Sequence, residues 1–517
     1  MKTVILSISA AVLSLIIQPA YSQTQPNVAA PPAPAAAATA GEIQQLQTLN
    51  GKFPEPVPEE QGVPSPPIIP QLDTIVDDEG QISTYNTAGQ FTAPSNDFFK
   101  SEGTNGRTCF TCHQFSDGMG LGQEHATDRF NADPNDPLFR LIDGATCPDD
   151  DVSTPAAMAQ AYSLLTAKGL IRINLPIQPG FQFQITNVTD TNGSDCNTNP
   201  NTGVTSPTTG FVNFYRRPIP STSLASESNI MWDTREPSLV HQAMDAELTH
   251  AQAANVPSTP NLNAIVSFES EVYDAQTDDT GLAGISVGAG GDLTGADGSG
   301  ATGGPVTLSQ AIANFTTGIN NPFGGSFNPA IFTMYNAFGT LTGTDTQTLE
   351  RQAIFRGQQV FNTVQFQITG VNGLNDVQGQ PSITGTCGTC HNNPDVGNFS
   401  SNVTMDTGVT DVSAPNGASS NLDESGLPIF TVLCTAGPDA GQTFTVTDIG
   451  VGMISGQCQD IGKTKVPTIR GIASRSPYFH NGSALQITNL VQFYNARFNI
   501  GLTAQQQSDL EVFLEAQ

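Results

Sequence analysis

Apolar residues recur with a helical period in the C-terminal third of the chain. In residues 344–363, one face of a predicted helix carries Leu349, Ala353, Ile354, Gly357, Val360 and Phe361. A second predicted helix begins near Ala484 and has an apolar face formed by Ile487, Leu490, Val491 and Tyr494. A third begins at a capping box of Thr503 and Gln506 and buries Leu510, Phe513 and Leu514. This part of the chain is therefore expected to have a helical frame.

Alternating and irregular stretches complete the pattern. Residues 428–450 alternate between apolar and polar side chains around a Gly-Pro-Asp turn, which predicts a β-hairpin. Near the other end, Ser95 is the predicted N-cap of a helix that begins at Asp97. Charged residues make up only 13% of the chain, whereas Gly, Asn, Thr, Ser and Pro are frequent. Long loops on a helical frame are therefore expected.

The first 22 residues have the pattern of a secretory signal. They combine the positive Lys2, an apolar run and a small-residue cleavage site that ends at Ser22. The alternative is an uncleaved anchor helix, but the apolar run is shorter than the ~20 residues that a membrane span needs. No later stretch is long and apolar enough to span a bilayer. We therefore expect an exported protein without a stable membrane span.

Composition divides the rest of the chain into four parts. The predicted parts are a Pro/Ala-rich, disordered leader at 23–90, an N-terminal unit at 91–265, a connector at 266–346 and a C-terminal unit at 347–517. The N-terminal unit contains a polar surface excursion at 189–210. The connector contains a Gly-rich stretch at 288–305, which favours a flexible loop over a calcium-binding loop because no repeat recurs.

The chain is strongly acidic. Its 47 acidic and 18 basic residues give a formal net charge of −29. Nucleic acids and anionic membrane surfaces repel such a chain, so no nucleic-acid partner is expected. A basic partner protein would be attracted, although the charge also serves solubility alone.

The eight cysteines fall into two groups. Two copies of Cys-x-x-Cys-His are formed by Cys109, Cys112, His113, Cys387, Cys390 and His391. The remaining four can pair in an oxidising compartment. Sequence order favours Cys147–Cys196 and Cys434–Cys458, which is one of three possible connectivities, and free buried thiols are the alternative.

Each Cys-x-x-Cys-His motif is the attachment signature of a c-type haem. Two thiols add to the vinyl groups of the porphyrin, and the adjacent histidine is the proximal ligand of the iron. A zinc site or a thioredoxin-like redox pair also uses paired cysteines. Neither explains a histidine directly after both pairs, and neither motif lies in a βαβ context. Two covalently bound haems, with His113 and His391 as ligands, are the prediction.

Two further stretches carry a more specific resemblance. The segment WDTRE begins at Trp232 between the motifs, and VPTIRGIASRSPYFHNGS at residues 466–483 follows the second motif. This order resembles the bacterial di-haem cytochrome c peroxidase superfamily, which includes the MauG-like enzyme that matures tryptophan tryptophylquinone. The likeness spans residues 95–514. It implies a mainly α fold of two cytochrome c-like haem domains, with long loops and a small β-hairpin insertion.

The resemblance implies a division of labour between the haems. Peroxide would react at the haem on His113, and the haem on His391 would supply or store electrons. Trp232 matches the family's electron relay between the haems. The position of the family's axial ligand to the second haem falls on Tyr494, as in the quinone-maturing relative. Two methionines, Met405 and Met453, are competing ligands.

One position departs from the family pattern. The acid–base glutamate falls on Gln252, which cannot transfer a proton at neutral pH. Peroxide activation needs such a group, so His250 or Glu247 is expected to substitute, unless the activity is absent. His125 could approach the first iron from the distal side. We expect His241 to be an ordinary helix histidine.

Other site residues are expected around the cofactors. Arg235 and Arg470 suit haem propionates, with ordinary surface ion pairs as the alternative. His480 lies in the PYFH loop and is expected to contact the second haem. Family members often hold an inter-domain calcium ion, so calcium is a further expected cofactor, although the sequence contains no recognisable ligand set for it.

The preferred prediction is a periplasmic, peroxidase-like oxidoreductase. Its partners would be hydrogen peroxide and a small electron-transfer protein or a protein substrate. A non-enzymatic electron-transfer cytochrome is the alternative, favoured by glutamine at position 252. Oxidative cleavage of an organic substrate by a dioxygen-binding haem is a third possibility.

Overall fold

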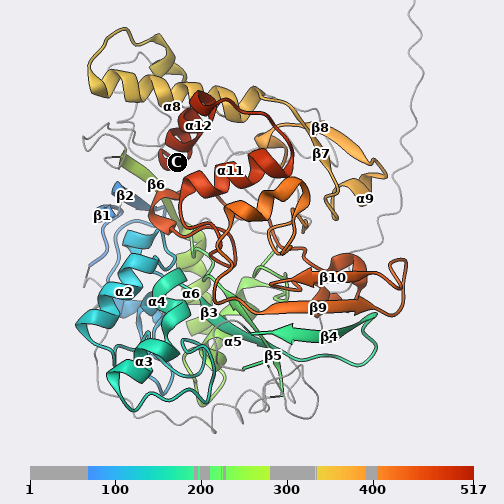
Figure 1. The fold of residues 1–517 in the computed structure, drawn as a ribbon. Helices are drawn as coiled ribbons and strands as arrows, with labels where there is room; N and C mark the ends of the chain where they lie inside the picture. The colour runs from blue at the N-terminus through green and yellow to red at the C-terminus, as the bar shows by residue number, and fades with distance from the viewer. Residues whose placement is uncertain are drawn as a thin grey trace, which may run out of the picture. The chain divides into compact units, whose positions relative to one another are not determined.

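The structure is a computed structural model. It describes residues 68–77, 79–190, 196–197, 210–222, 224, 229–279, 332, 335–391 and 404–517 (Figure 1). The chain divides into two units, residues 1–33 and 34–517, and every described residue belongs to the second. The predicted secretory signal and Gly-rich loop, and most of the predicted leader and polar excursion, lie outside the described residues.

The longer helices begin at side chains that cap them. Ser238 accepts a hydrogen bond from the His241 N–H at the start of α5, and Asp345 caps α8 in the same way. The α-helices are α2 (Gln123–Ala132), α3 (Pro155–Ala161), α4 (Ser163–Lys168), α5 (Leu239–Thr249), α6 (Thr259–Glu271), α8 (Thr346–Thr363), α9 (Asn375–Gln378), α10 (Gly452–Ser455), α11 (Ile487–Arg497) and α12 (Ala504–Glu515). The 3₁₀ helices are η1 (Ala93–Ser95), η2 (Asp97–Phe99), η3 (Cys109–Thr111), η4 (Phe115–Asp117), η6 (Asn336–Thr340), η7 (Cys387–Thr389), η8 (Pro415–Asn421), η9 (Cys458–Asp460) and η10 (Ala473–Arg475).

Small antiparallel sheets connect distant parts of the chain. Their strands are β1 (Leu72–Asp77), β2 (Gly80–Asn86), β3 (Ile171–Leu175), β4 (Phe183–Thr189), β5 (Val212–Arg216), β6 (Val272–Asp279), β7 (Phe366–Thr369), β8 (Ser382–Gly385), β9 (Ile429–Cys434) and β10 (Thr443–Val446). The described sheets have the orders β1-β2-β6, β10-β9-β4, β3-β5 and β7-β8. Strand β4 pairs with β9, with Phe183 opposite Cys434, so the two halves of the chain share one sheet.

The sequence pattern predicted several of these elements. Helices α8, α11 and α12 and the β9–β10 hairpin confirm the predictions made for those stretches. Helical residues make up 36% and strand residues 18% of the described chain, so the expected mainly α fold is met only in part. The prediction for Ser95 was wrong. It ends η1, and the side chain of Asn96 caps η2 instead by accepting from the Phe98 N–H.

Both predicted disulfides are confirmed. Cys147 bonds to Cys196, and Cys434 at the end of β9 bonds to Cys458 at the start of η9. The four cysteines of the two Cys-x-x-Cys-His motifs form no disulfide. Four cysteines therefore form structural disulfides and the other four belong to the two motifs, as the sequence indicated.

The C-terminal half has its core where α8 and α12 cross (Figure 1). Ile354, Phe361 and Phe513 are buried in this contact. Gly357 makes the close approach possible, because a Cβ atom there would lie 1.9 Å from the carbonyl oxygen of Asp509. Backbone atoms cannot move aside cheaply, so only glycine fits this position without separating the helices.

We expect Gly357→Ala to destabilise the protein. Alanine favours the helix by about 1 kcal/mol over glycine, but overpacking a core contact costs typically 1–3 kcal/mol and here involves backbone. Because backbone is involved, we expect the upper part of this cost and a net loss of about 1–2 kcal/mol in the free energy of unfolding, measured by urea denaturation. The control is Thr346→Ala at the exposed first position of α8, which should change stability by less than about 0.5 kcal/mol. Equal stability of the two variants would contradict the packing account.

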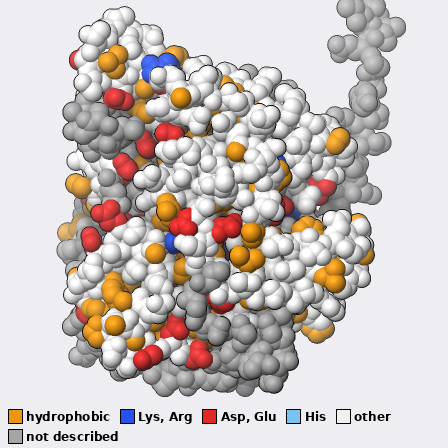
Figure 2. All heavy atoms as spheres, viewed as in Figure 1, with side chains coloured by type: hydrophobic (Ala, Val, Ile, Leu, Met, Phe, Trp, Pro, Cys, Tyr) orange, Lys and Arg blue, Asp and Glu red, His pale blue; other side chains and the backbone are white. Residues whose placement is uncertain are grey.

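Two surface findings bear on partners. On the face shown in Figure 2, acidic side chains are spread widely and basic side chains are few, as the net charge of −29 requires. Among the described residues, no helix combines the length and apolar character needed to cross a bilayer.

Candidate functional site

The first Cys-x-x-Cys-His motif lies at the wall of a cavity of about 1040 Å³. Cys109, Cys112 and His113 all line this cavity. The motif is held by a capping box, in which the Thr108 N–H donates to the hydroxyl of Thr111. The tight 3₁₀ turn brings both thiols and the imidazole to one side of the chain.

His113 is prepared to act as a metal ligand. Its Nδ1 lies 2.9 Å from the carbonyl oxygen of Met119 and 3.2 Å from the hydroxyl of Ser221. Donation from Nδ1 to the carbonyl fixes the tautomer and leaves the lone pair on Nε2. Burial lowers the pKa of His113 to about 4; the hydrogen bond to Met119 opposes this shift, and the nearby His250 adds to it. The imidazole is therefore neutral, as a ligand must be.

Helix α5 forms another part of the first cavity wall. Gln242, Glu247 and His250 line the cavity from this helix or its C-cap. His250 Nδ1 lies 2.5 Å from Asp143 Oδ2, and the other oxygen of Asp143 accepts from the Arg107 guanidinium at 2.5 Å. Burial alone would raise the pKa of Asp143, but Arg107 and the hydrogen bond from His250 lower it to about 2. An ionised Asp143 therefore orients His250 and leaves its Nε2 available to accept a proton.

Two buried glutamates also line the first cavity. Burial, and after it the charges of Glu102 and Asp97, raises the pKa of Glu247 to about 7. Burial raises the pKa of Glu269 to about 7, and a hydrogen bond with Ser221 lowers it in part. Both groups can change protonation state near neutral pH. The sequence analysis missed Glu269, because nothing in the pattern of α6 distinguishes it from a surface residue.

The second motif lines a larger cavity of about 1680 Å³. Cys387, Cys390 and His391 lie in its wall. Thr386 and Thr389 form the same capping box as at the first motif. The shared sequence Thr-Cys-x-Thr-Cys-His was a visible signal for this repeated turn, and the sequence analysis did not use it.

Tyr494 and Met405 both line the second cavity, whereas Met453 lies in a separate core cluster with β9 and η9. Met405 Sδ lies 3.8 Å from Cys390 Sγ. Burial raises the pKa of Tyr494, and the charges of nearby Cys390 and Cys387 raise it further. Both side chains are therefore close to the motif, and the phenol is protonated unless a cation binds it.

Trp232 lies where the two cavities approach each other. Its indole lines the second cavity, while the preceding Met231 lines the first. Lys465 lines both cavities, and its N–H donates to the Trp232 carbonyl at 2.9 Å. The indole Nε1 donates to the Arg217 carbonyl at 2.8 Å, and the ring centroid lies 5.9 Å from that of His480. Pro218 and Pro220 also line both cavities, so Trp232 lies beside the residues that the two sites share.

A buried ionic network supports this segment. Arg216 pairs with Asp233, which follows Trp232, and binds Asp448 through Nε and Nη2 at 2.6 and 2.9 Å. Each of these three side chains is at most 2% exposed. His480 Nε2 lies 3.7 Å from Asp448 Oδ2, and burial lowers the pKa of His480 to about 4. The network joins the tryptophan loop to the C-terminal half of the chain.

Several predicted site residues lie outside both cavity walls. Gln252 accepts a hydrogen bond from Asn105 through Oε1, and His125 pairs with Asp117 at 3.1 Å. Arg235 pairs with Asp233 at 2.9 Å, and Arg470 lies near Asp274, whose pKa burial raises against the opposing effect of this and other neighbours. The structure does not bring these four residues to either cavity. The basic side chains that do line the cavities are Arg107, Arg217, Lys465 and Arg475.

The residues present fit a porphyrin at each site. Each cavity combines two thiols that form no disulfide, one motif histidine and basic side chains that suit carboxylates. In each site the two thiols would hold the group covalently, and His113 or His391 would be the iron ligand.

Tyr494→Phe tests the ligand of the second site. If the phenol binds the iron, its loss should change the low-spin ferric spectrum assigned to that haem, measured by EPR and optical absorption. Met405→Leu is the matched comparison, because both side chains line the same cavity. A spectrum altered by Met405→Leu and unaffected by Tyr494→Phe would assign the ligand to methionine instead.

Comparisons with known proteins support part of this picture. No protein-family model matches the chain. A curated relative, cytochrome-c peroxidase IdrP1 from Denitromonas iodatirespirans, is 36% identical over 69 residues, which cover 11% of this chain and 18% of the relative. The chain therefore matches less than a fifth of the length of that relative. Over these 69 residues the chain is similar to a protein named a cytochrome-c peroxidase, which agrees with the resemblance to the di-haem cytochrome c peroxidase superfamily that the sequence motifs indicated.

A solved structure of a MauG-like protein associated with microbial copper homeostasis also matches, at 13% sequence identity. The match covers 59% of this chain and 76% of that chain with a TM-score of 0.29. We draw no argument from a likeness at this TM-score.

Proposed function

We propose that the protein is an exported di-haem oxidoreductase that reduces peroxide in the first cavity with electrons passed from the second. The observation that carries this proposal is the position of Trp232 and Met231, adjacent residues that line different cavities, each containing a Cys-x-x-Cys-His motif. A relay through one indole suits electron transfer between two fixed redox groups. The supporting relative is named a cytochrome-c peroxidase.

A haem held by Cys109, Cys112 and His113 would supply the iron at which a peroxide binds and its O–O bond is cleaved. The remaining chemistry is proton movement by the chain. His250 Nε2 takes a proton from the near oxygen of the peroxide and returns it to the far oxygen, which leaves as water. Asp143 holds the imidazole in the tautomer that this transfer needs. His250 thus takes the role that Gln252 cannot fill.

Electrons enter through the second cavity. A haem held by Cys387, Cys390 and His391 would accept them from a small donor protein or an oxidisable protein substrate. The indole N–H of Trp232 donates to a backbone carbonyl, which cannot accept its proton. The indole therefore keeps this proton when it passes an electron. The electron donor would meet this protein in the periplasm. A donor protein with a basic surface would be attracted to the acidic chain.

The test is turnover of hydrogen peroxide by the di-haem protein with a reduced small cytochrome as donor. Donor oxidation at two electrons per peroxide is expected, together with a high-spin ferric EPR signal from the first haem. The alternative function is a non-enzymatic electron-transfer cytochrome. It predicts two low-spin ferric haems and reversible redox waves, without any peroxide-dependent oxidation of the donor.

A further inference from the structure

A buried carboxylate in the wall of the first cavity has no cation beside it. Glu269 lies in the last turn of α6, is 4% exposed and lines this cavity. Its Oε2 atom has no hydrogen-bond partner, and none of the described Lys, Arg and His side chains forms an ion pair with it. A negative charge in the last turn of a helix is also unfavourable, because that end of the helix dipole is negative. Packing and helix stability therefore do not explain this carboxylate.

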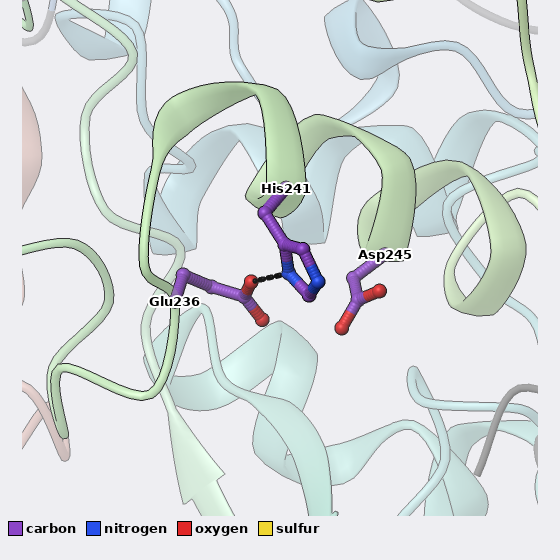
Figure 3. Close-up of side chains that lie close together, drawn as sticks. All are labelled: Glu236, His241 and Asp245. Carbon is purple, nitrogen blue, oxygen red and sulfur yellow. Dashed lines mark hydrogen bonds and ion pairs between the residues drawn. The ribbon is translucent and has the colours of Figure 1, made fainter. Parts of the chain in front are cut away.

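Two other buried acids of the N-terminal half have basic partners. Asp143 is paired with Arg107 at 2.5 Å. Glu236 Oε2 lies 2.7 Å from His241 Nδ1, and Figure 3 shows the imidazole turned toward this carboxylate. The surroundings of Glu269 are different, because its neighbour is a hydroxyl group.

The Ser221 hydroxyl connects Glu269 to the histidine of the first motif. Its Oγ lies 3.2 Å from His113 Nδ1, and the same hydroxyl is hydrogen-bonded to Glu269. The Ser221 N–H donates to the Met119 carbonyl at 2.9 Å, which fixes the serine beside the carbonyl that also accepts from His113 Nδ1. A hydroxyl can accept one hydrogen bond and donate another. The contacts therefore form a continuous path from the imidazole to the carboxylate.

We propose that Ser221 and Glu269 form a hydrogen-bond relay that increases electron donation from His113 to the iron of the first site. The His113 Nδ1 proton is shared between the Met119 carbonyl and Ser221 Oγ, and the Ser221 hydroxyl donates its own proton to Glu269. Successive hydrogen bonds polarise one another, and a carboxylate at the end of the relay makes the histidine a more basic ligand. A more basic ligand stabilises ferric iron and lowers its reduction potential. Ser221 and Glu269 are thus positioning residues that act through His113.

The two cavities differ in their acidic groups. Asp143, Glu247 and Glu269 line the first cavity, whereas no Asp or Glu among the described residues lines the second. The relay therefore favours oxidised iron at the site where we propose that peroxide reacts. This inference deepens the proposed function but rests only on a haem in the first cavity, so its test does not require the protein to reduce peroxide.

The experiment measures the reduction potential of the first haem in the purified di-haem protein by spectroelectrochemistry, at a pH well above neutral so that Glu269 is ionised. Glu269→Gln and Ser221→Ala are each expected to shift the equilibrium toward ferrous iron by about 10-fold or more, and a 10-fold shift is a rise of about 59 mV for one electron. The double variant should match Glu269→Gln, because a single break interrupts the relay. Ser221→Thr keeps the hydroxyl and should stay close to the parent protein.

Glu247→Gln is the matched control, because it removes the same charge from another buried side chain of the first cavity wall. Burial raises the pKa of Cys109, and the charges of Glu247 and then of Glu269 raise it further. Glu247 thus acts on the attachment turn through space at least as strongly as Glu269. A charge effect alone would give Glu247→Gln at least the shift of Glu269→Gln, whereas the relay predicts a clearly smaller one.

The iron–histidine vibration of the first haem is a second readout, which a purely structural role of the two residues would not move. It is recorded by resonance Raman after photolysis of bound carbon monoxide. Its frequency should fall in Ser221→Ala and Glu269→Gln and stay unchanged in Glu247→Gln. An unchanged frequency in Ser221→Ala, or a potential shift in Glu247→Gln that equals the shift in Glu269→Gln, would overturn the proposal.

Discussion

Replacing His250 with glutamine is expected to slow the reaction of hydrogen peroxide at the first haem by about 10²–10⁴-fold. This is the usual contribution of a positioned general acid–base group. His250 lines the first cavity, and its Nδ1 is held at 2.5 Å by the ionised Asp143. Glutamine preserves size and polarity but cannot take up a proton at neutral pH. The rate is measured by stopped-flow absorption with peroxide in excess.

His125→Gln is the matched comparison for this prediction. It makes the same chemical change at a histidine that is also paired with an aspartate, but outside the cavity wall. We expect its rate to stay within about twofold of the parent protein. A large loss in the His125 variant with no change in the His250 variant would contradict the proposed role of His250. It would instead support the earlier expectation that His125 approaches the first iron.

Arg216→Met is expected to lower the free energy of unfolding by about 3–5 kcal/mol. Removing one partner of a buried ion pair leaves the other charge buried and uncompensated. This uncompensated charge causes most of the loss in the free energy of unfolding. Arg216 binds both Asp233 and Asp448, and all three side chains are at most 2% exposed. In this variant Asp233 still pairs with Arg235. Most of the loss in stability therefore comes from Asp448, whose buried carboxylate loses its guanidinium partner. Guanidinium denaturation of the di-haem protein measures the change.

The control is Lys100→Met. Lys100 pairs with Asp97 at 2.8 Å, but its side chain is 40% exposed. Exposed pairs contribute roughly 0–1 kcal/mol, so this variant should be close to the parent in stability. A loss of less than about 1 kcal/mol for Arg216→Met would show that the network is not needed to hold the two halves of the chain together.

Local pattern was enough to predict the features that depend on nearby residues. The helical stripe with Ile354 and Phe361, the alternation in β9 and β10, and the capping box at Thr503 all depend on neighbours within a few positions. The two attachment motifs are likewise contiguous. Both disulfides could be predicted because they join cysteines adjacent in order, after the motif cysteines are set aside.

Features that depend on distant residues could not be predicted in this way. Asp143 is 107 positions from His250, and no local period indicates that they meet. The same holds for β4 and β9, which form one sheet from opposite halves of the chain. Spacing counted from Trp232 placed Gln252 at the acid–base position, and the structure shows that this residue has a φ of 56° and does not line the first cavity. Counting residues does not detect such a backbone conformation.

The most direct test of the central claim is the intact mass of the protein isolated from a host that can attach c-type haems. The account predicts the polypeptide mass plus two haem groups, falling to one group when either Cys109 and Cys112 or Cys387 and Cys390 are changed to serine. A colourless protein, or a parent protein that carries a single haem, would contradict it.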